Sequence, residues 1–260
     1  MKQGNIRLII VTEDERFYLA EAIEYFLSQI PSGYDVVSVV VLKHYYGKLS
    51  RSLWIRARQI LKVSGWRVLA RIVWRIVIGR MMSSRSVATV IRNHGISILK
   101  GVENINTTKT IQDLARYDPD LIVAIGVNSL FRKPLRELAR LGCINVHTGI
   151  RPQHRGRAAI FWALADGDTE TGITVHYIDG GVDSGRTIAS RRYRITVRSF
   201  DKLLHDLRLL SIVTLIEALS IVRNGKDQKY EKDLSVQYGF RPLPDIQDLM
   251  AFVKAGNKFL

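Results

Sequence analysis

Residues 118–147 read DPDLIVAIGVNSLFRKPLRELARLGCINVH, and their pattern changes from strand to helix and back to strand. Leu121–Ile125 and Cys143–His147 are short apolar runs, which are typical of strands buried on both faces of a sheet. Pro134–Leu141, between them, has the apolar spacing of a helix. A strand, a crossover helix and a second strand form a unit in which the two strands run parallel. The stretch therefore predicts one unit of a parallel α/β sheet.

The same alternation extends toward the N-terminus. We therefore predict a Rossmann-like, doubly wound α/β fold, in which a mostly parallel sheet has flanking helices. The earlier elements that we expect are strands at Ile6–Thr12, Val36–Leu42 and Ile96–Leu99, and helices at Glu13–Ile30 and around Thr110–Tyr117.

The second half of the chain changes character, because two longer strands precede one long amphipathic helix. Residues 224–260 are polar, end in a short helix and are too few for an independent domain. We therefore predict one domain over residues 1–223, with a basic helical insertion at about residues 43–95, and a C-terminal extension over residues 224–260. The later elements that we expect are helices at Arg157–Ala165 and Phe200–Arg223 and strands at Gly172–Ile178 and Arg186–Ile195.

The composition narrows the class of protein. The 260 residues are 47% hydrophobic, which fits neither a disordered chain nor a protein with many membrane spans. The single cysteine excludes a disulfide framework and points to a reducing compartment. The N-terminus has no apolar signal-peptide region, so we expect a cytoplasmic protein.

The net charge of +15 is concentrated in one segment. No acidic residue lies between Asp35 and Glu103, whereas 13 lysines and arginines do. Within this interval, Trp66–Met82 is strongly apolar and carries Arg67 and two further arginines at helical spacing. A membrane span is disfavoured, because each central arginine costs about 2.5–3.5 kcal/mol on insertion. We rank a helix packed on the sheet with solvated arginines first, a helix of residues 50–82 lying on an anionic membrane surface second, and nucleic-acid binding third.

Polar residues gather in two clusters, at residues 142–156 and 171–185. Asn145 and His147 are two residues apart at a strand end, so their side chains share one face. In a doubly wound sheet, ligands bind at the carboxyl ends of the strands. The second cluster ends in a glycine-rich loop that holds Asp179 and Asp183.

Asparagine, histidine and aspartate in one cleft suit the transfer of an acyl group to an amine. An imidazole with an ordinary pKa of about 6.5 takes the proton that the attacking amine loses. A carboxylate fixes the tautomer of the ring, and an amide N–H stabilises the oxyanion. These residues therefore indicate an acyl-transfer site, although Asn-x-His alone is a common tripeptide.

Structural roles remain open for several of these residues. His147 alone could be a structural histidine, and Asp183 could cap a turn. Arg155 either contacts an anionic substrate or is solvated. We predict that Asp179 forms a turn at Gly180-Gly181, that His176 is structural, and that the buried Cys143 is inert. No spacing of histidine and cysteine indicates zinc, and we expect no metal.

The two clusters together resemble the signature of the folate-dependent formyltransferases. GCINVHTGIRPQHRG at residues 142–156 is similar to the Asn-x-His motif with its proline loop ending in Arg-Gly. TGITVHYIDGGVDSG at residues 171–185 is similar to the Thr-Gly-x-Thr-x-His segment that ends in Asp-x-Gly. The spacing from Asn145 to Asp183 also matches, and the similarity covers about residues 96–195. The resemblance implies transfer of a formyl group from N10-formyltetrahydrofolate to an amine.

The resemblance also implies a role for each matching residue. Asn145 would polarise the formyl oxygen, His147 would act as general acid and base, and Asp183 would orient His147. Two features depart from the usual family pattern and concern the shape of the pocket: His154 stands where an aromatic residue or proline is usual, and the loop at residues 126–129 is more polar. The donor would be bound by Ser129, Leu130 and Phe131 with Ile178, Asp179, Gly180 and Val182, and the acceptor by Thr148, Arg155 and Gly156.

The acceptor amine divides this family into branches. Residues 224–260 are too few for the RNA-binding barrel of methionyl-tRNA formyltransferases, and the basic insertion is absent from the compact glycinamide ribonucleotide formyltransferases. Phe161-Trp162 is similar to the sugar N-formyltransferases. We therefore expect a small anionic acceptor, the amino group of a nucleotide-linked or phosphorylated amino sugar. The other two branches remain alternatives, as does a basic membrane-surface or anion-binding module with a silent site, and a homodimer remains open.

Overall fold

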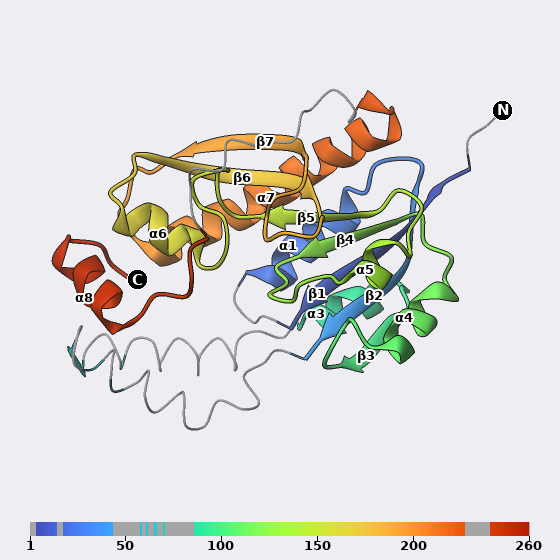
Figure 1. Ribbon diagram of the computed structural model, residues 1–260, viewed down its shortest axis with the longest axis horizontal. Helices are drawn as coiled ribbons and strands as arrows, with labels where there is room; N and C mark the ends of the chain where they lie inside the picture. The colour runs from blue at the N-terminus through green and yellow to red at the C-terminus, as the bar shows by residue number, and fades with distance from the viewer. Residues whose placement is uncertain are drawn as a thin grey trace.

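The computed structural model describes residues 4–14, 18–43, 86–226 and 240–259, together with five positions between residues 58 and 70. A seven-stranded sheet with helices on both faces forms the centre of this structure (Figure 1). The predicted Rossmann-like α/β fold is confirmed.

Five parallel strands and two antiparallel strands make up the sheet, in the order β3-β2-β1-β4-β5-β6-β7. The order reverses between β1 and β4, which makes this the topological switch point of the sheet. The parallel strands are β1 (Ile6–Glu13), β2 (Tyr34–Leu42), β3 (Ile98–Val102), β4 (Leu121–Ile125) and β5 (Cys143–His147), and the antiparallel ones are β6 (Glu170–Tyr177) and β7 (Thr187–Arg194).

The helices cover both faces of the sheet because side chains alternate along its buried strands. On β1, Leu8 and Ile10 join the core beneath α1, α3 and α7, whereas Ile9 and Val11 join the core beneath α4 and α5. Figure 1 shows α1 and α7 on one side of the sheet and α4 and α5 on the other. The helices are α1 (Leu19–Ser28), α3 (Val87–Asn93), α4 (Thr108–Ala115), α5 (Lys133–Arg136), α6 (Ala159–Ala165), α7 (Phe200–Arg223) and α8 (Ile246–Lys254).

Two predicted helices differ from the structure by more than two residues at one end. The helix expected from Glu13 begins only at Leu19, because β1 continues through Glu13. The helix expected over Pro134–Leu141 is a single turn, α5. The chain leaves that turn because the N–H of Leu141 donates to the Asp120 carbonyl, 2.7 Å away, and so leads directly into β5.

The end of the chain packs onto the main core. Phe252 of α8 is fully buried, and its ring stacks on Phe161 of α6 with the ring centres 4.7 Å apart. The N–H of Phe200, at the start of α7, donates to the carbonyl of Lys258. Figure 1 shows α8 beside α6, next to the C-terminus. Residues 240–259 therefore extend the core that α6 and α7 form.

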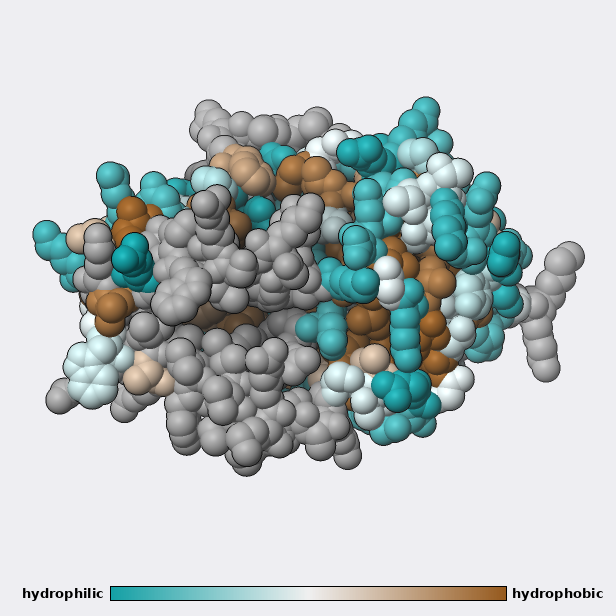
Figure 2. All heavy atoms as spheres, turned by 90° about the horizontal axis from the view of Figure 1, so that it is seen from below, coloured by the Kyte–Doolittle hydropathy of each residue, from teal (hydrophilic) through white to brown (hydrophobic). Residues whose placement is uncertain are grey.

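Little of the predicted basic insertion lies within the described residues. Of residues 43–95, only residue 43, five positions between residues 58 and 70, and residues 86–95 with helix α3 are described. Apart from Trp66 and residue 70, the run Trp66–Met82 lies outside the described part. Among the residues that were described, no helix is long and apolar enough to cross a membrane. On the face shown in Figure 2, hydrophilic and apolar side chains are interleaved over the described residues.

Candidate active site

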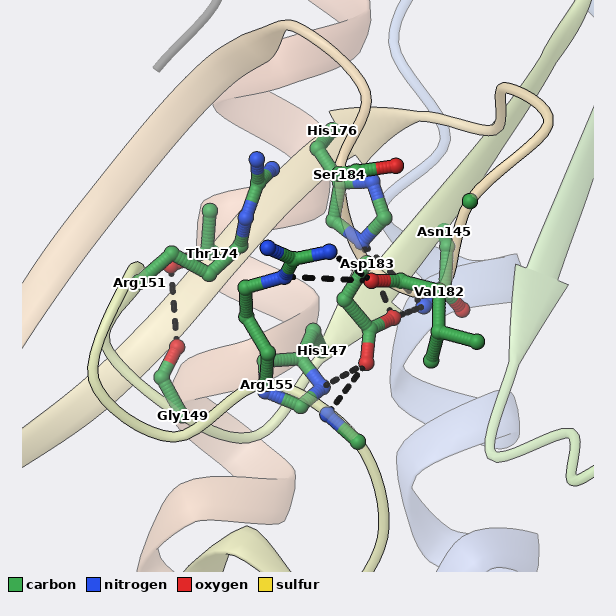
Figure 3. Close-up of polar contacts among 12 residues, drawn as sticks. Asn145, His147, Gly149, Arg151, Arg155, Thr174, His176, Val182, Asp183 and Ser184 are labelled. Atoms are coloured by element: carbon green, nitrogen blue, oxygen red, sulfur yellow. Dashed lines mark hydrogen bonds and ion pairs between the residues drawn. The ribbon is translucent and has the colours of Figure 1, made fainter. Parts of the chain in front are cut away.

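The site lies at the carboxyl end of β5, where the parallel part of the sheet meets its antiparallel part. Asn145 and His147 are both on β5, and in the register with β6 they lie opposite His176 and Thr174. Asp183 follows β6 in a loop, with a positive φ of 45°. Figure 3 shows the carboxylate of Asp183 directed toward the side chains of β5.

The Asp183 carboxylate gathers four partners from three parts of the chain. Its Oδ2 accepts the N–H of Gly156 at 2.9 Å and lies 3.6 Å from His147 Nδ1. Its Oδ1 accepts from Asn145 Nδ2 at 3.3 Å and lies 3.4 Å from His176 Nε2. The side chain of Asp183 is only 12% exposed, so these contacts replace water around a buried charge. The sequence-predicted triad of Asn145, His147 and Asp183 is therefore brought together in one place.

The surroundings of Asp183 and His147 set the protonation states of these two residues. Burial raises the pKa of Asp183, but His147, His176 and the Gly156 N–H outweigh it and hold that pKa well below its usual range. Burial lowers the pKa of His147, while the Asp183 carboxylate partly opposes this effect. At neutral pH, the Asp183 carboxylate therefore lies beside a neutral His147 imidazole, and the imidazole can accept a proton.

The second nitrogen of the His147 ring is also engaged. Nε2 lies 2.6 Å from the His154 carbonyl oxygen, to which a ring N–H donates. With that proton on Nε2, the basic nitrogen is Nδ1, which faces Asp183, so protonation of Nδ1 creates an ion pair. Gly149 makes room for this ring, because a Cβ there would lie 2.7 Å from Nε2.

The loop predicted to line the donor pocket follows β4. Ser129 and Leu130 are exposed, as a lining role requires, whereas the side chain of Phe131 is 3% exposed and packs in the core beneath α5. The buried carboxylate of Glu13 accepts the N–H of Asn128 at 2.7 Å. The other end of the loop is held by Asn106, whose Nδ2 donates to the Leu130 carbonyl and whose Oδ1 accepts the N–H of Arg132.

The second predicted donor segment is the glycine-rich loop after β6. The N–H of Ile178 donates to the Cys143 carbonyl at 2.8 Å, which fixes the start of the loop on β5. Asp179 Oδ1 accepts the N–H of Gly181 at 3.0 Å and the hydroxyl of Ser184. The predicted turn-forming role of Asp179 is confirmed, and Gly180 is exposed at the turn.

The residues predicted to bind the acceptor lie along the loop that follows β5. Arg155 donates from Nε and Nη2 to the Val182 carbonyl, at 3.1 and 2.8 Å, so its guanidinium is tied to the glycine-rich loop (Figure 3). Gly156 provides the N–H that binds Asp183. Thr148 is half-buried and directly follows His147.

Two histidines of this site, His154 and His176, were not predicted to be part of it. His176 was predicted to be structural, yet its Nε2 lies 3.4 Å from both Asp183 Oδ1 and Asn145 Nδ2. His154 is buried, and its ring contacts Asp168 while its carbonyl holds His147. The signal for His176 is its pairing with Asn145 across the antiparallel strands β5 and β6. Nothing local in the sequence indicates a role for His154.

Neither a reactive thiol nor a metal cluster is found in the described part of the chain. Burial raises the pKa of the Cys143 thiol to about 12, which agrees with the predicted inert cysteine. The described residues contain no group of three histidine, cysteine, aspartate or glutamate side chains suited to a metal ion.

Comparison with known proteins finds formyltransferases that are similar to this chain. Residues 80–207 match the model of the formyl transferase family. The methionyl-tRNA formyltransferase of Geobacter metallireducens is 32% identical over 156 residues, which are 60% of this chain and 50% of that protein. That of Agathobacter rectalis is 31% identical over 186 residues, which are 66% and 60% of the two chains. This chain thus spans about half the length of the curated relatives it matches.

Solved structures share the fold at low sequence identity. Glycinamide ribonucleotide transformylase 1 of Symbiobacterium toebii has a TM-score of 0.61 at 18% identity, over 86% of this chain and 90% of that chain. An N-formyltransferase of Helicobacter canadensis, solved with folinic acid and dTDP-3-aminofucose, has a TM-score of 0.56 at 15% identity, over 96% and 80% of the two chains.

Proposed function

We propose that this chain, whose residues 80–207 match the formyl transferase family, is a folate-dependent formyltransferase. It would transfer the formyl group of N10-formyltetrahydrofolate to the amine of a nucleotide-linked or phosphorylated amino sugar. The observation that carries the proposal is the buried Asp183 carboxylate, which contacts His147 and Asn145 at the carboxyl end of β5. An enzyme that acylates an amine needs a base, an oxyanion donor and a group that orients the base, and these three residues provide them.

The residues around the site fit a folate donor. The exposed loop at residues 128–130 is held by Glu13 and Asn106, so its backbone has a fixed position. Together with the loop at residues 178–182, it would hold the pteridine ring, whose edge carries hydrogen-bond donors and acceptors. The donor supplies the formyl carbon that the amine attacks.

His147 accepts and returns the proton of the reaction, and Asp183 stabilises the protonated ring. As the amine forms a bond to the formyl carbon, it loses a proton, and the neutral His147 ring accepts it. The Asp183 carboxylate, 3.6 Å from Nδ1, stabilises the imidazolium that results. His147 then returns the proton to the departing nitrogen, so the ring ends neutral and one C–N bond replaces another.

Asn145 stabilises the oxygen that gains negative charge. Its Nδ2 makes two long contacts, at 3.3 Å to Asp183 and 3.4 Å to His176, so its hydrogens are weakly held. A developing oxyanion competes well for such hydrogens, and one donor of this kind contributes about 10²–10³ in rate.

The charge of the chain supports an anionic acceptor. The net charge of +15 attracts anions by long-range steering, and Arg155 lies within the site itself. The single buried cysteine fits a reducing compartment such as the cytoplasm. Methionyl-tRNA and glycinamide ribonucleotide remain the alternative acceptors, because relatives named for them share this domain.

A screen of amine acceptors with N10-formyltetrahydrofolate tests the proposal. We expect formylation of an amino-sugar nucleotide, detected as a mass increase of the acceptor and as release of tetrahydrofolate. Formylation of initiator methionyl-tRNA or glycinamide ribonucleotide, with no amino sugar accepted, would contradict the proposed acceptor. Failure of every amine would favour a binding module with a silent site.

A further inference from the structure

The backbone of the C-terminal segment at residues 240–242 is paired with the loop that holds the Asp183 carboxylate. The N–H of Arg241 donates to the Arg155 carbonyl at 3.0 Å, and the N–H of Arg157 donates to the Arg241 carbonyl at 2.9 Å. Gly156, between these two arginines, donates its own N–H to Asp183. The segment therefore flanks the residue that contacts the proposed catalytic carboxylate.

Side chains fix the segment in this place. The Arg241 guanidinium lies 2.6 Å from Asp166 Oδ2 and covers the ring of Trp162, with 4.7 Å to the ring centre. Trp162 Nε1 donates to the Pro242 carbonyl at 2.9 Å. Because Trp162 is buried in α6, the position of the segment is tied to the core.

Phe240 lies against the bare face of Gly156. Gly156 has a φ of +101°, and a Cβ there would lie 2.7 Å from the Phe240 ring and 2.6 Å from the Arg241 carbonyl oxygen. The glycine thus allows the aromatic ring to approach the loop closely. Phe240 nevertheless leaves 53% of its surface exposed, so part of the ring is open to a ligand.

Two arginines, Arg155 and Arg157, flank the glycine that this ring contacts. Arg157 is exposed, and the guanidinium of the half-buried Arg155 donates to the Val182 carbonyl. Two described acids of this region are already paired, Asp166 with Arg241 and Asp183 with the groups of the active site. Within the described ranges, neither Arg155 nor Arg157 forms an ion pair with a carboxylate. An exposed aromatic ring next to two such arginines suits a molecule with a planar base and phosphates.

From this arrangement we infer that Phe240 is a specificity-determining residue, which stacks on the base of a nucleoside diphosphate acceptor, while Arg157 and Arg155 attract its phosphates. The inference rests on the proposed function, because it names the acceptor class of that site. It assigns to the C-terminal segment a wall of the acceptor site, beside the loop that holds Asp183.

Calorimetric binding of uridine and thymidine diphosphates, without any formyl donor, tests the inference. We expect the wild type to bind a nucleoside diphosphate and Phe240→Ala to weaken that binding about tenfold or more, since base stacking on an aromatic ring is lost. Phe240→Tyr should restore it. Binding of inorganic pyrophosphate, which has no base, should be the same in wild type and Phe240→Ala.

Met250→Ala is the matched control, because Met250 is also about half exposed, at 55%, but lies on α8. It should bind the nucleotides as the wild type does, and melting curves should show all three variants folded. Binding by Phe240→Ala equal to that of the wild type, or no nucleotide binding by an enzyme that formylates amines, would overturn the inference. Nucleotide binding without formyl transfer would instead contradict the proposed function alone.

Discussion

At the residue scale, the site depends on one buried carboxylate. Asp183 contacts two imidazoles, one amide and one backbone N–H, and each of these stabilises its anionic form. A buried charge without such partners would be costly. Its contacts keep Asp183 ionised, and its charge in turn favours the protonated form of His147.

We predict that Asp183→Asn shifts the pH dependence of formyl transfer. The carboxylate raises the pKa of His147 against the lowering effect of burial, so its removal lets that pKa fall further. Because the neutral ring is the base, activity is lost as the pH falls through its pKa. The acid limb of kcat/KM should therefore move to lower pH, with a plateau about 10²–10⁴-fold lower.

Asp113→Asn, on the surface helix α4, serves as the control for this pH profile. It should leave both the acid limb and the plateau where the wild type has them. An acid limb that stays in place in Asp183→Asn would show that this carboxylate does not act on His147.

The sequence allowed the triad to be predicted but not the groups around it. Asn145, His147 and Asp183 stand in two motifs whose residue types suit acyl transfer. Glu13 and His154 join the site region through contacts that depend on the fold, since Glu13 binds a loop 115 residues further along the chain. Such contacts leave no pattern in either local sequence.

At the element scale, strands and helices with strong apolar patterns were predicted well. β4, β5 and α7 have their predicted bounds, because each has a long or fully buried apolar run. α5 was predicted too long, since Leu138 and Leu141 continue the helical spacing while the chain is held by the Asp120 carbonyl. Tertiary hydrogen bonds outweighed local helix propensity there.

We predict that Phe252→Ala in α8 destabilises the fold by about 3–5 kcal/mol, because the lost ring leaves a cavity between Phe161 and Phe259. Urea denaturation measures the free energy of unfolding. The exposed Met250→Ala in the same helix should change it by about 0.5 kcal/mol or less. Equal stability of Phe252→Ala and wild type would mean that α8 is not part of the core.

At the scale of the whole molecule, the excess positive charge and the candidate active site lie in different parts of the sequence. The 13 basic residues between Asp35 and Glu103 precede both active-site motifs, and most lie outside the described residues. Most of the excess positive charge therefore lies outside the motifs that carry the proposed acyl-transfer site.

Flotation with lipid vesicles separates the two leading interpretations of the basic segment. If its helix packs on the sheet with solvated arginines, the protein should remain in the dense fraction with both neutral and anionic vesicles. Flotation with anionic vesicles alone, reversed by salt, would instead establish attachment of residues 50–82 to the membrane surface.

We propose that His147 moves the proton during formyl transfer to an amine. The most direct test is the rate of tetrahydrofolate release from N10-formyltetrahydrofolate with an accepted amine, for the wild type and His147→Ala, with melting curves recorded for both. We expect a rate about 10²–10⁴-fold lower for the folded variant. An unchanged rate in folded His147→Ala would contradict it.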